Sequence, residues 1–313
     1  MKIAFHIDKI TIRGYSVAIY DYAKYNEEIL KNKSIILFPE TEIMNCEPIA
    51  LKRMSRFLVI SYKNLDEILQ RLGCDILYCI KYGYNDNVYS TNIKTVIHCV
   101  FDMSQQHGDV YAGVSETLTK KFNQTHYVPH MISLKKIHDL NLKSILGIPE
   151  NTIVFGRYGG IDTFNLLWCW EVIEKIVKQR KDIYFLLNNT VKLKEHSQIK
   201  YYKNIISEDD KNKFINTCDA YIECGNLGHT FGLAIGEFSV FHKPIIAYNN
   251  KDIWNTAHFD ILKDCALYYK NEEEFYNILS SFDKKDFIGK DLNFYKDYSP
   301  EKVMEKFNTV FLT

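Results

Sequence analysis

A glycine-rich loop, a histidine and a carboxylate stand close together in the segment 219–248, DAYIECGNLGHTFGLAIGEFSVFHKPIIAY. A short apolar run leads into a loop with Gly225 and Gly228, and the loop carries His229 and Thr230 into an apolar helix. The order predicts a strand, a loop, a helix and a second strand. A glycine loop that enters a helix is a common phosphate-binding device, because the first N–H groups of a helix are unpaired.

Glu237 lies two turns into this largely apolar helix. An isolated buried charge is costly, so we expect its carboxylate to accept hydrogen bonds from a neutral polyol such as a ribose. The backbone N–H groups near Thr230, Phe231 and Gly232 would then hold a diphosphate, and Gly232 would let the ligand approach. The alternative is an ordinary strand-loop-helix unit in which Glu237 lies on the polar face.

Arg157 is a second candidate, in GRYGGIDTFN at 156–165. It directly follows an apolar run and precedes the flexible pair Gly159 and Gly160. A guanidinium matches the geometry of phosphate oxygens, so Arg157 is predicted to neutralise a diphosphate. The alternative is an exposed loop arginine.

Three histidines and one acidic pair need separate interpretations. His98 in TVIHCVFD has apolar neighbours, so it is either a core histidine or a site residue. His107 and His130 are loop candidates for acceptor or phosphate contacts. Asp209–Asp210 opens a predicted helix, where acidic residues are favourable without any metal. The zinc, serine-nucleophile, dinucleotide and P-loop motifs are absent from the sequence, and we expect neither a metal nor a bound cofactor.

Composition limits the function classes further. Acidic and basic residues number 39 each, which argues against a nucleic-acid-binding protein. No apolar stretch reaches about 18 residues, so no membrane span is expected. The eight cysteines lack a CxxC pair, and the start MKIAFHID lacks the apolar region of a signal peptide. These features predict reduced thiols and a cytoplasmic location, or the host cytoplasm if the protein is viral.

Strands and helices are predicted to alternate in both halves of the chain. In the first part, strands are expected at 2–7, 34–38, 75–80, 95–100 and 109–115, with helices at 17–32, 65–72 and 117–122. After a charged stretch, strands are expected at 153–160, 182–189, 220–224, 244–248 and 266–269, with helices at 166–180, 209–218, 272–282 and 299–312. This alternation predicts an α/β fold of two Rossmann-like domains with the ligand in the cleft between them.

The ordered motifs of the C-terminal half resemble the nucleotide-sugar-binding domain of the GT-B glycosyltransferases, within them the retaining glycosyltransferase family four. The matching pieces are LGIPENTIVFGRYGG, DIYFLLNNT, the 218–248 segment and the closing helix after YSPEKV. FGRYGGIDTFN and HTFGLAIGEFS are most similar to a subset of small bacterial and large-virus enzymes. The resemblance covers 140–313 well and is looser over 1–130.

This resemblance implies donor-binding roles on the second domain. Glu237 matches the glutamate that binds the nucleotide ribose, and Arg157 matches the basic residue on the donor diphosphate. The backbone around Phe231, Gly232 and Leu233 would bind phosphate and sugar.

The resemblance also implies a domain plan and a reaction. Residues 1–133 would form the acceptor-side domain, 134–296 the donor domain, and 297–313 a helix that crosses back to the first domain. In the first domain, His98 matches a histidine near the transferred sugar, and Gly14 matches a glycine loop beside the phosphates. The implied enzyme is a metal-independent hexosyltransferase. It would move a sugar from a UDP- or GDP-sugar to a glycan, lipid-linked or protein acceptor, with retention.

The sequence departs from the family pattern at two positions. The family's first glutamate, eight residues before Glu237, is His229 here, whose charge depends on pH. The family's lysine beyond the arginine is missing, because 159–165 contains no cation. Both changes affect stabilisation of the leaving group, so His229 joins Arg157 and His98 as a catalytic candidate. A catalytically degenerate nucleotide-sugar-binding subunit is the second hypothesis, and a nucleotide-sugar epimerase of similar architecture is the third.

Overall fold

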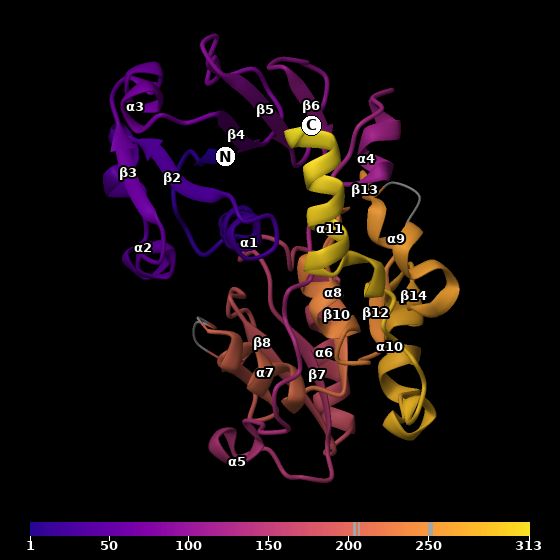
Figure 1. The fold of residues 1–313 in the computed structure, drawn as a ribbon. Helices are drawn as coiled ribbons and strands as arrows, with labels where there is room; N and C mark the ends of the chain where they lie inside the picture. The colour runs from indigo at the N-terminus through magenta and orange to yellow at the C-terminus, as the bar shows by residue number, and fades with distance from the viewer. Residues whose placement is uncertain (203–204, 206, 250–252) are drawn as a thin grey trace. The chain divides into compact units, whose positions relative to one another are not determined.

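The computed structural model describes residues 1–202, 205, 207–249 and 253–313. The chain divides into two compact units (Figure 1), here called unit 1 (Met1–Ser133 with Asp297–Thr313) and unit 2 (Leu134–Lys296). Each unit contains a six-stranded sheet in which neighbouring strands are parallel. The predicted α/β class is therefore confirmed in both units.

Unit 1 has the sheet order β3-β2-β1-β4-β5-β6. Its strands are β1 (Lys2–His6), β2 (Lys33–Pro39), β3 (Leu58–Tyr62), β4 (Ile76–Lys81), β5 (Lys94–Cys99) and β6 (Val110–Gly113). Its helices are α1 (Gly14–Glu28), α2 (Pro48–Met54), α3 (Leu65–Leu72), α4 (Glu116–Lys121) and α11 (Pro300–Phe307), and α11 continues into a short π-helix at Asn308–Leu312.

Local sequence signals account for several of these helix ends. The Asn64 side chain accepts a hydrogen bond from the Glu67 N–H at 3.2 Å and so caps α3. Gly73 ends α3 at φ +59°, a conformation that glycine adopts without strain. Pro300 occupies the first position of α11, where its missing N–H costs no helical hydrogen bond, and Ser299 before it makes no side-chain capping bond among the described residues.

Helix α11 belongs to the core of unit 1, although it is the last helix of the chain. Its buried residues include Phe307, whose ring lies 5.4 Å from the ring of Tyr22 on α1 and 6.4 Å from that of Phe5 on β1. Figure 1 shows α11, in yellow, beside α1. Aromatic packing of this kind explains how the apolar stripe of the helix holds it to unit 1.

Unit 2 has the sheet order β14-β12-β10-β7-β8-β9, and a short separate pair joins β11 to β13. The strands are β7 (Ile153–Arg157), β8 (Ile183–Asn188), β9 (Ile199–Tyr202), β10 (Ala220–Glu223), β11 (Gly228–His229), β12 (Ile245–Tyr248), β13 (Asn255–Thr256) and β14 (Leu267–Tyr269). The helices are α5 (Lys143–Leu146), α6 (Leu167–Gln179), α7 (Glu208–Thr217), α8 (Leu233–Ser239), α9 (Ala257–Leu262) and α10 (Glu272–Ser281).

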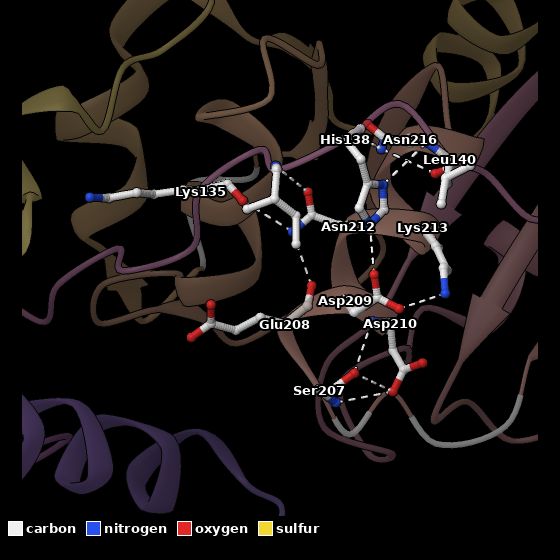
Figure 2. A network of polar contacts seen from close by, with 11 residues as sticks. Lys135, His138, Leu140, Ser207, Glu208, Asp209, Asp210, Asn212, Lys213 and Asn216 are labelled. Carbon is white, nitrogen blue, oxygen red and sulfur yellow. Dashed lines mark hydrogen bonds and ion pairs between the residues drawn. The ribbon is translucent and has the colours of Figure 1, made fainter.

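An irregular segment at the start of unit 2 is fastened to helix α7 by polar contacts (Figure 2). The Asn212 side chain accepts a hydrogen bond from the Ile137 N–H at 2.9 Å and donates one to the Lys135 carbonyl at 3.0 Å. His138 contacts the Asp209 carboxylate at 2.6 Å. These contacts fix the path of the chain as it enters the second sheet.

Two further findings concern the chain as a whole. Across the described ranges, no helix combines the length and apolar character that crossing a membrane requires. All eight cysteines are free thiols, and seven of them are buried, the exception being Cys265.

Candidate functional site

The sheet of unit 2 reverses its strand order between β7 and β10. From β7 the chain builds β8 and β9 on one side, then returns to place β10 on the other side of β7. In open α/β sheets, ligands bind outside the carboxyl ends of the strands at such a reversal. Arg157 is the last residue of β7 and Glu223 is the last residue of β10, so two charged side chains flank this position.

Arg157 is fully buried, so the alternative of an exposed loop arginine is wrong. Its guanidinium donates to the Asn189 carbonyl at 3.3 Å, the Thr190 hydroxyl at 2.8 Å and the Gly160 carbonyl at 2.9 Å, and it also contacts the Thr163 hydroxyl. All four acceptors are neutral, and Nε is buried with no hydrogen-bond partner among the described residues. The positive charge of Arg157 is thus held in place by dipoles rather than cancelled by a bonded carboxylate.

Glu223 is a site residue that the sequence did not single out. Its side chain is 3% exposed, accepts a hydrogen bond from the Tyr221 hydroxyl at 2.8 Å, and lies 3.0 Å from His229 Nε2. Burial alone would raise the pKa of the Glu223 carboxyl, but the attraction of His229 and Arg157 outweighs it and lowers the pKa to about 2. The available signal was a glutamate inside the apolar run AYIEC, since a buried charge needs partners.

His229, on β11, lies between Glu223 and His258. The distance between His229 Nε2 and Glu223 Oε2 is that of an ion pair, although the ring N–H is not aligned for a full hydrogen bond. The His258 ring, fully buried on α9, lies 5.1 Å from the His229 ring, centroid to centroid. Burial lowers the pKa of His258 to about 3, so this neighbour is neutral near pH 7. Glu223 therefore supplies the negative charge that faces His229.

Glu237 is buried on α8, as the sequence predicts, but its carboxylate already has protein partners. One oxygen accepts a hydrogen bond from the Tyr158 hydroxyl, and the other pairs with the Lys211 ammonium. Lys211 comes from α7, 26 residues earlier in the chain, and the sequence offered no sign of this contact. A ribose hydroxyl at Glu237 would share the carboxylate with Lys211 or displace it.

The segment between His229 and α8 follows a tight path. Gly232 lies just before α8 at φ +89°, and a Cβ there would be 3.2 Å from the Tyr295 hydroxyl. That hydroxyl donates to the Phe231 carbonyl at 2.8 Å. Thr230 is buried, and Leu233 begins α8, a helix of seven residues. The predicted use of this backbone to bind phosphate remains a prediction.

The charge of the missing family lysine could instead come from Lys192 or Lys194, which follow β8 in the sequence. Lys194 pairs with Glu171 at 3.1 Å and with Glu174 at 2.5 Å on α6. Lys192 lies over the Tyr201 ring at 5.3 Å. Both ammonium groups thus have partners elsewhere on unit 2, whereas the ammonium group of Lys211 contacts Glu237.

The predicted residues of unit 1 lie in different surroundings. His98, near the end of β5, is fully buried, with Nδ1 2.6 Å from the Tyr78 hydroxyl and Nε2 2.8 Å from the Val128 carbonyl. Burial lowers the pKa of His98 to about 4, so it is neutral at pH 7. This is the arrangement of a core histidine, and a catalytic role for His98 stays a prediction. Gly14 is exposed and begins α1.

The other two loop histidines of unit 1 already have polar neighbours. His107 contacts the Gln105 carbonyl at 2.6 Å through Nδ1 and the Lys81 ammonium at 3.3 Å through Nε2. His130 is buried, 3.4 Å from the Tyr22 hydroxyl. Neither position tests the predicted acceptor or phosphate contacts.

The sheet of unit 1 reverses its order between β1 and β4, and buried polar residues also lie there. His6 ends β1 and its Nε2 lies 2.7 Å from the Tyr62 hydroxyl. Lys81 ends β4, donates to the Val88 carbonyl at 2.8 Å and pairs with Asp86. These residues are the second group that sequence reasoning missed, because each stands at the end of an apolar strand.

The acidic pair Asp209–Asp210 has structural partners (Figure 2). Asp209 contacts His138 and Lys213, and Asp210 forms a reciprocal capping box with Ser207 at the start of α7. The interpretation of this pair as a favourable helix start is confirmed.

Comparison with known proteins identifies the fold of the chain. No protein-family model and no curated sequence matches the chain. The structure is similar to Anabaena HepE, solved with UDP and glucose, at a TM-score of 0.75 and 12% identity, with all of both chains covered. It is also similar to WaaG, a glycosyltransferase of lipopolysaccharide biosynthesis, at a TM-score of 0.69 and 9% identity, covering 98% of this chain and 99% of WaaG.

A third similar structure is a putative UDP-N-acetylglucosamine 2-epimerase from Listeria monocytogenes. Its TM-score is 0.62 at 10% identity, covering 97% of this chain and 94% of that one. Together these similarities show that the chain has the GT-B fold, which confirms the predicted fold class. At such low identities they establish the architecture, and the function must be argued from the site.

Proposed function

We propose that this chain is a glycosyltransferase that moves a sugar from a nucleotide-diphosphate sugar to an acceptor hydroxyl. The observation that carries the proposal is the pair of buried charges, Arg157 and Glu223, at the strand-order reversal of unit 2 in a GT-B chain. Buried charge of this kind is expensive, and its concentration at the ligand-binding edge of a sheet favours a functional explanation.

The donor would bind to unit 2 through three groups of atoms. Arg157, whose hydrogen-bond acceptors in the described part of the chain are all neutral, would stabilise the diphosphate as it leaves. Glu237 would accept hydrogen bonds from the ribose hydroxyls in competition with Lys211. The backbone at 230–233, where Gly232 adopts φ +89°, would contact phosphate and sugar.

The reaction would retain the anomeric configuration, use no metal and transfer a hexose, as expected from the resemblance to family four. Unit 1 would bind the acceptor, which could be a glycan, a lipid-linked saccharide or a protein. UDP-glucose is the first donor to test, because HepE was also solved in complex with UDP-glucose. GDP-sugars form the matched second series.

Calorimetric titration of the folded protein with UDP-sugars and GDP-sugars tests the proposal. We expect at least one nucleotide sugar to bind, and Arg157→Gln to weaken its binding because the diphosphate loses its cation. Arg180→Gln serves as a matched control, since Arg180 pairs with Asp182 near the surface. Failure of every nucleotide sugar to bind folded protein would refute the proposal.

A catalytically degenerate binding subunit is the second candidate, and two observations favour it. The carboxylate of Glu237 and the guanidinium of Arg157 both have protein partners, and His229 stands where the family has a glutamate. His229→Glu discriminates between the two readings. Transfer activity gained from an inactive parent supports degeneracy, whereas loss of existing activity supports an adapted histidine. Sugar release that needs no acceptor would instead favour an epimerase.

A further inference from the structure

Among the residues that the structure describes, none of fixed charge is in direct contact with Glu223, yet Glu223 is among the most buried acidic residues of unit 2. The contacts of its carboxylate are the neutral Tyr221 hydroxyl at 2.8 Å and His229 Nε2 at 3.0 Å. The low pKa of the Glu223 carboxyl, about 2, shows that it is ionised across the physiological range. An ionised carboxylate 3.0 Å from a ring nitrogen attracts positive charge on that ring.

Within the described part of the chain, the groups that face His229 come from three elements. Glu223 approaches from the end of β10, and His258 approaches from α9 as a neutral ring. β13 runs beside His229, pairing through Thr256, which carries no charge. Arg157 acts on Glu223 through space from the end of β7. Among the described neighbours, Glu223 is therefore the source of negative charge at His229, and the positive charge of Arg157 acts on Glu223.

We propose that Glu223 is a positioning residue of the donor site. Its carboxylate holds the protonated imidazole of His229 by Nε2, which leaves Nδ1, on a side chain that is 23% exposed, to donate a hydrogen bond to the donor. The proton comes from solvent and stays on the ring. This arrangement supplies a positive charge in a segment whose neighbouring loop, 159–165, contains no lysine or arginine.

The inference rests on the proposed function, since it assigns His229 to the same nucleotide-sugar site. It explains why a histidine stands eight residues before Glu237 together with a glutamate six residues before that histidine. A diphosphate carries negative charge that an imidazolium can pair with, whereas a neutral imidazole contributes one hydrogen bond at most.

The test measures the affinity for UDP by calorimetry between pH 5.5 and 8.5. In the wild type, UDP is expected to bind more tightly at the acid end of this range, because a positively charged His229 ring attracts the diphosphate. Glu223→Gln should weaken binding at pH 6 by roughly tenfold or more, the usual effect of losing a hydrogen-bonded charge. Glu223→Asp, which keeps the charge, should bind UDP more tightly than Glu223→Gln. Glu273→Gln, at an exposed position of α10, is the matched control.

A double-mutant cycle separates positioning from general support of the fold. If Glu223 acts through His229, then Glu223→Gln adds almost nothing to the loss caused by His229→Ala. Equal losses in both backgrounds overturn the proposal.

If Glu223→Gln fails to fold, His229→Gln provides the test. A pH dependence of UDP binding in His229→Gln that matches the wild type also overturns the proposal. If neither UDP nor a nucleotide sugar binds folded wild-type protein, the proposed function fails and the inference with it. If UDP binds equally to all variants, the inference alone fails.

Discussion

Replacing the buried carboxylate of Glu223 by an amide should change how the stability of unit 2 depends on acid. The pKa of the Glu223 carboxyl falls from its ordinary value of 4.5 to about 2 in the folded protein. At about 1.4 kcal/mol for each pH unit, this difference corresponds to about 3 kcal/mol of folding free energy. The residue is almost fully buried, so solvent screening removes little of this amount.

The sign follows from the two pKa values. Above about pH 4.5 the carboxylate is ionised in both the folded and the unfolded chain, and its interactions stabilise the fold in full. Below that pH the unfolded chain takes up the proton first. The stabilisation is therefore lost progressively until the folded carboxyl is protonated near pH 2. The Gln variant has no such proton to bind.

Urea unfolding followed by tryptophan fluorescence measures this effect in unit 2, where Glu223 lies. The three tryptophans of the chain, Trp168, Trp170 and Trp254, all lie in unit 2. The gap in unfolding free energy between the wild type and Glu223→Gln should shrink by about 3 kcal/mol from pH 5 to pH 2. For the control Glu273→Gln, the difference in unfolding free energy from the wild type should stay the same from pH 5 to pH 2. A Glu223→Gln gap that is also constant over this range would refute the electrostatic account of Glu223.

Three further substitutions test other parts of the structure. Gly232→Ala should cost unit 2 about 1–2 kcal/mol, because an alanine at φ +89° is strained, and unchanged urea unfolding would contradict this. His98→Ala should cost roughly 2–4 kcal/mol in thermal unfolding followed by circular dichroism, since it leaves a cavity and two unpaired groups; full stability with lost activity would instead support the predicted catalytic role. Ser207→Ala removes the capping box of α7 and should lower the free energy of urea unfolding by about 1 kcal/mol. An unchanged free energy of unfolding would show that the capping box does not stabilise unit 2.

Regular local signals made much of the fold predictable. The helix predicted at 65–72 follows from an apolar stripe, and α3 spans the predicted residues before Gly73 ends it. Two of the missed strands, β3 and β9, are edge strands. β3 and β9 are mostly half-buried, so their sequences lack the continuous apolar run that marks the central strands of a parallel sheet.

A residue of the candidate site was predictable only where its immediate neighbours in the sequence marked it. Arg157 was noticed because a glycine pair follows it, and Glu237 because its helix is apolar. Glu223 falls within the strand predicted at 220–224, and Lys211 falls within the helix predicted at 209–218. Their roles depend on contacts between segments far apart in the chain, such as the pairing of Lys211 with Glu237, which no local pattern encodes.

A structure of the full chain with UDP or GDP bound is the sharpest test of the proposed donor site, because it locates the nucleotide and its contacts together. We expect the diphosphate within reach of Arg157 and the backbone at Gly232, with the ribose hydroxyls at Glu237. A nucleotide bound away from the carboxyl ends of β7 and β10, with these side chains unchanged, would contradict the proposed donor site.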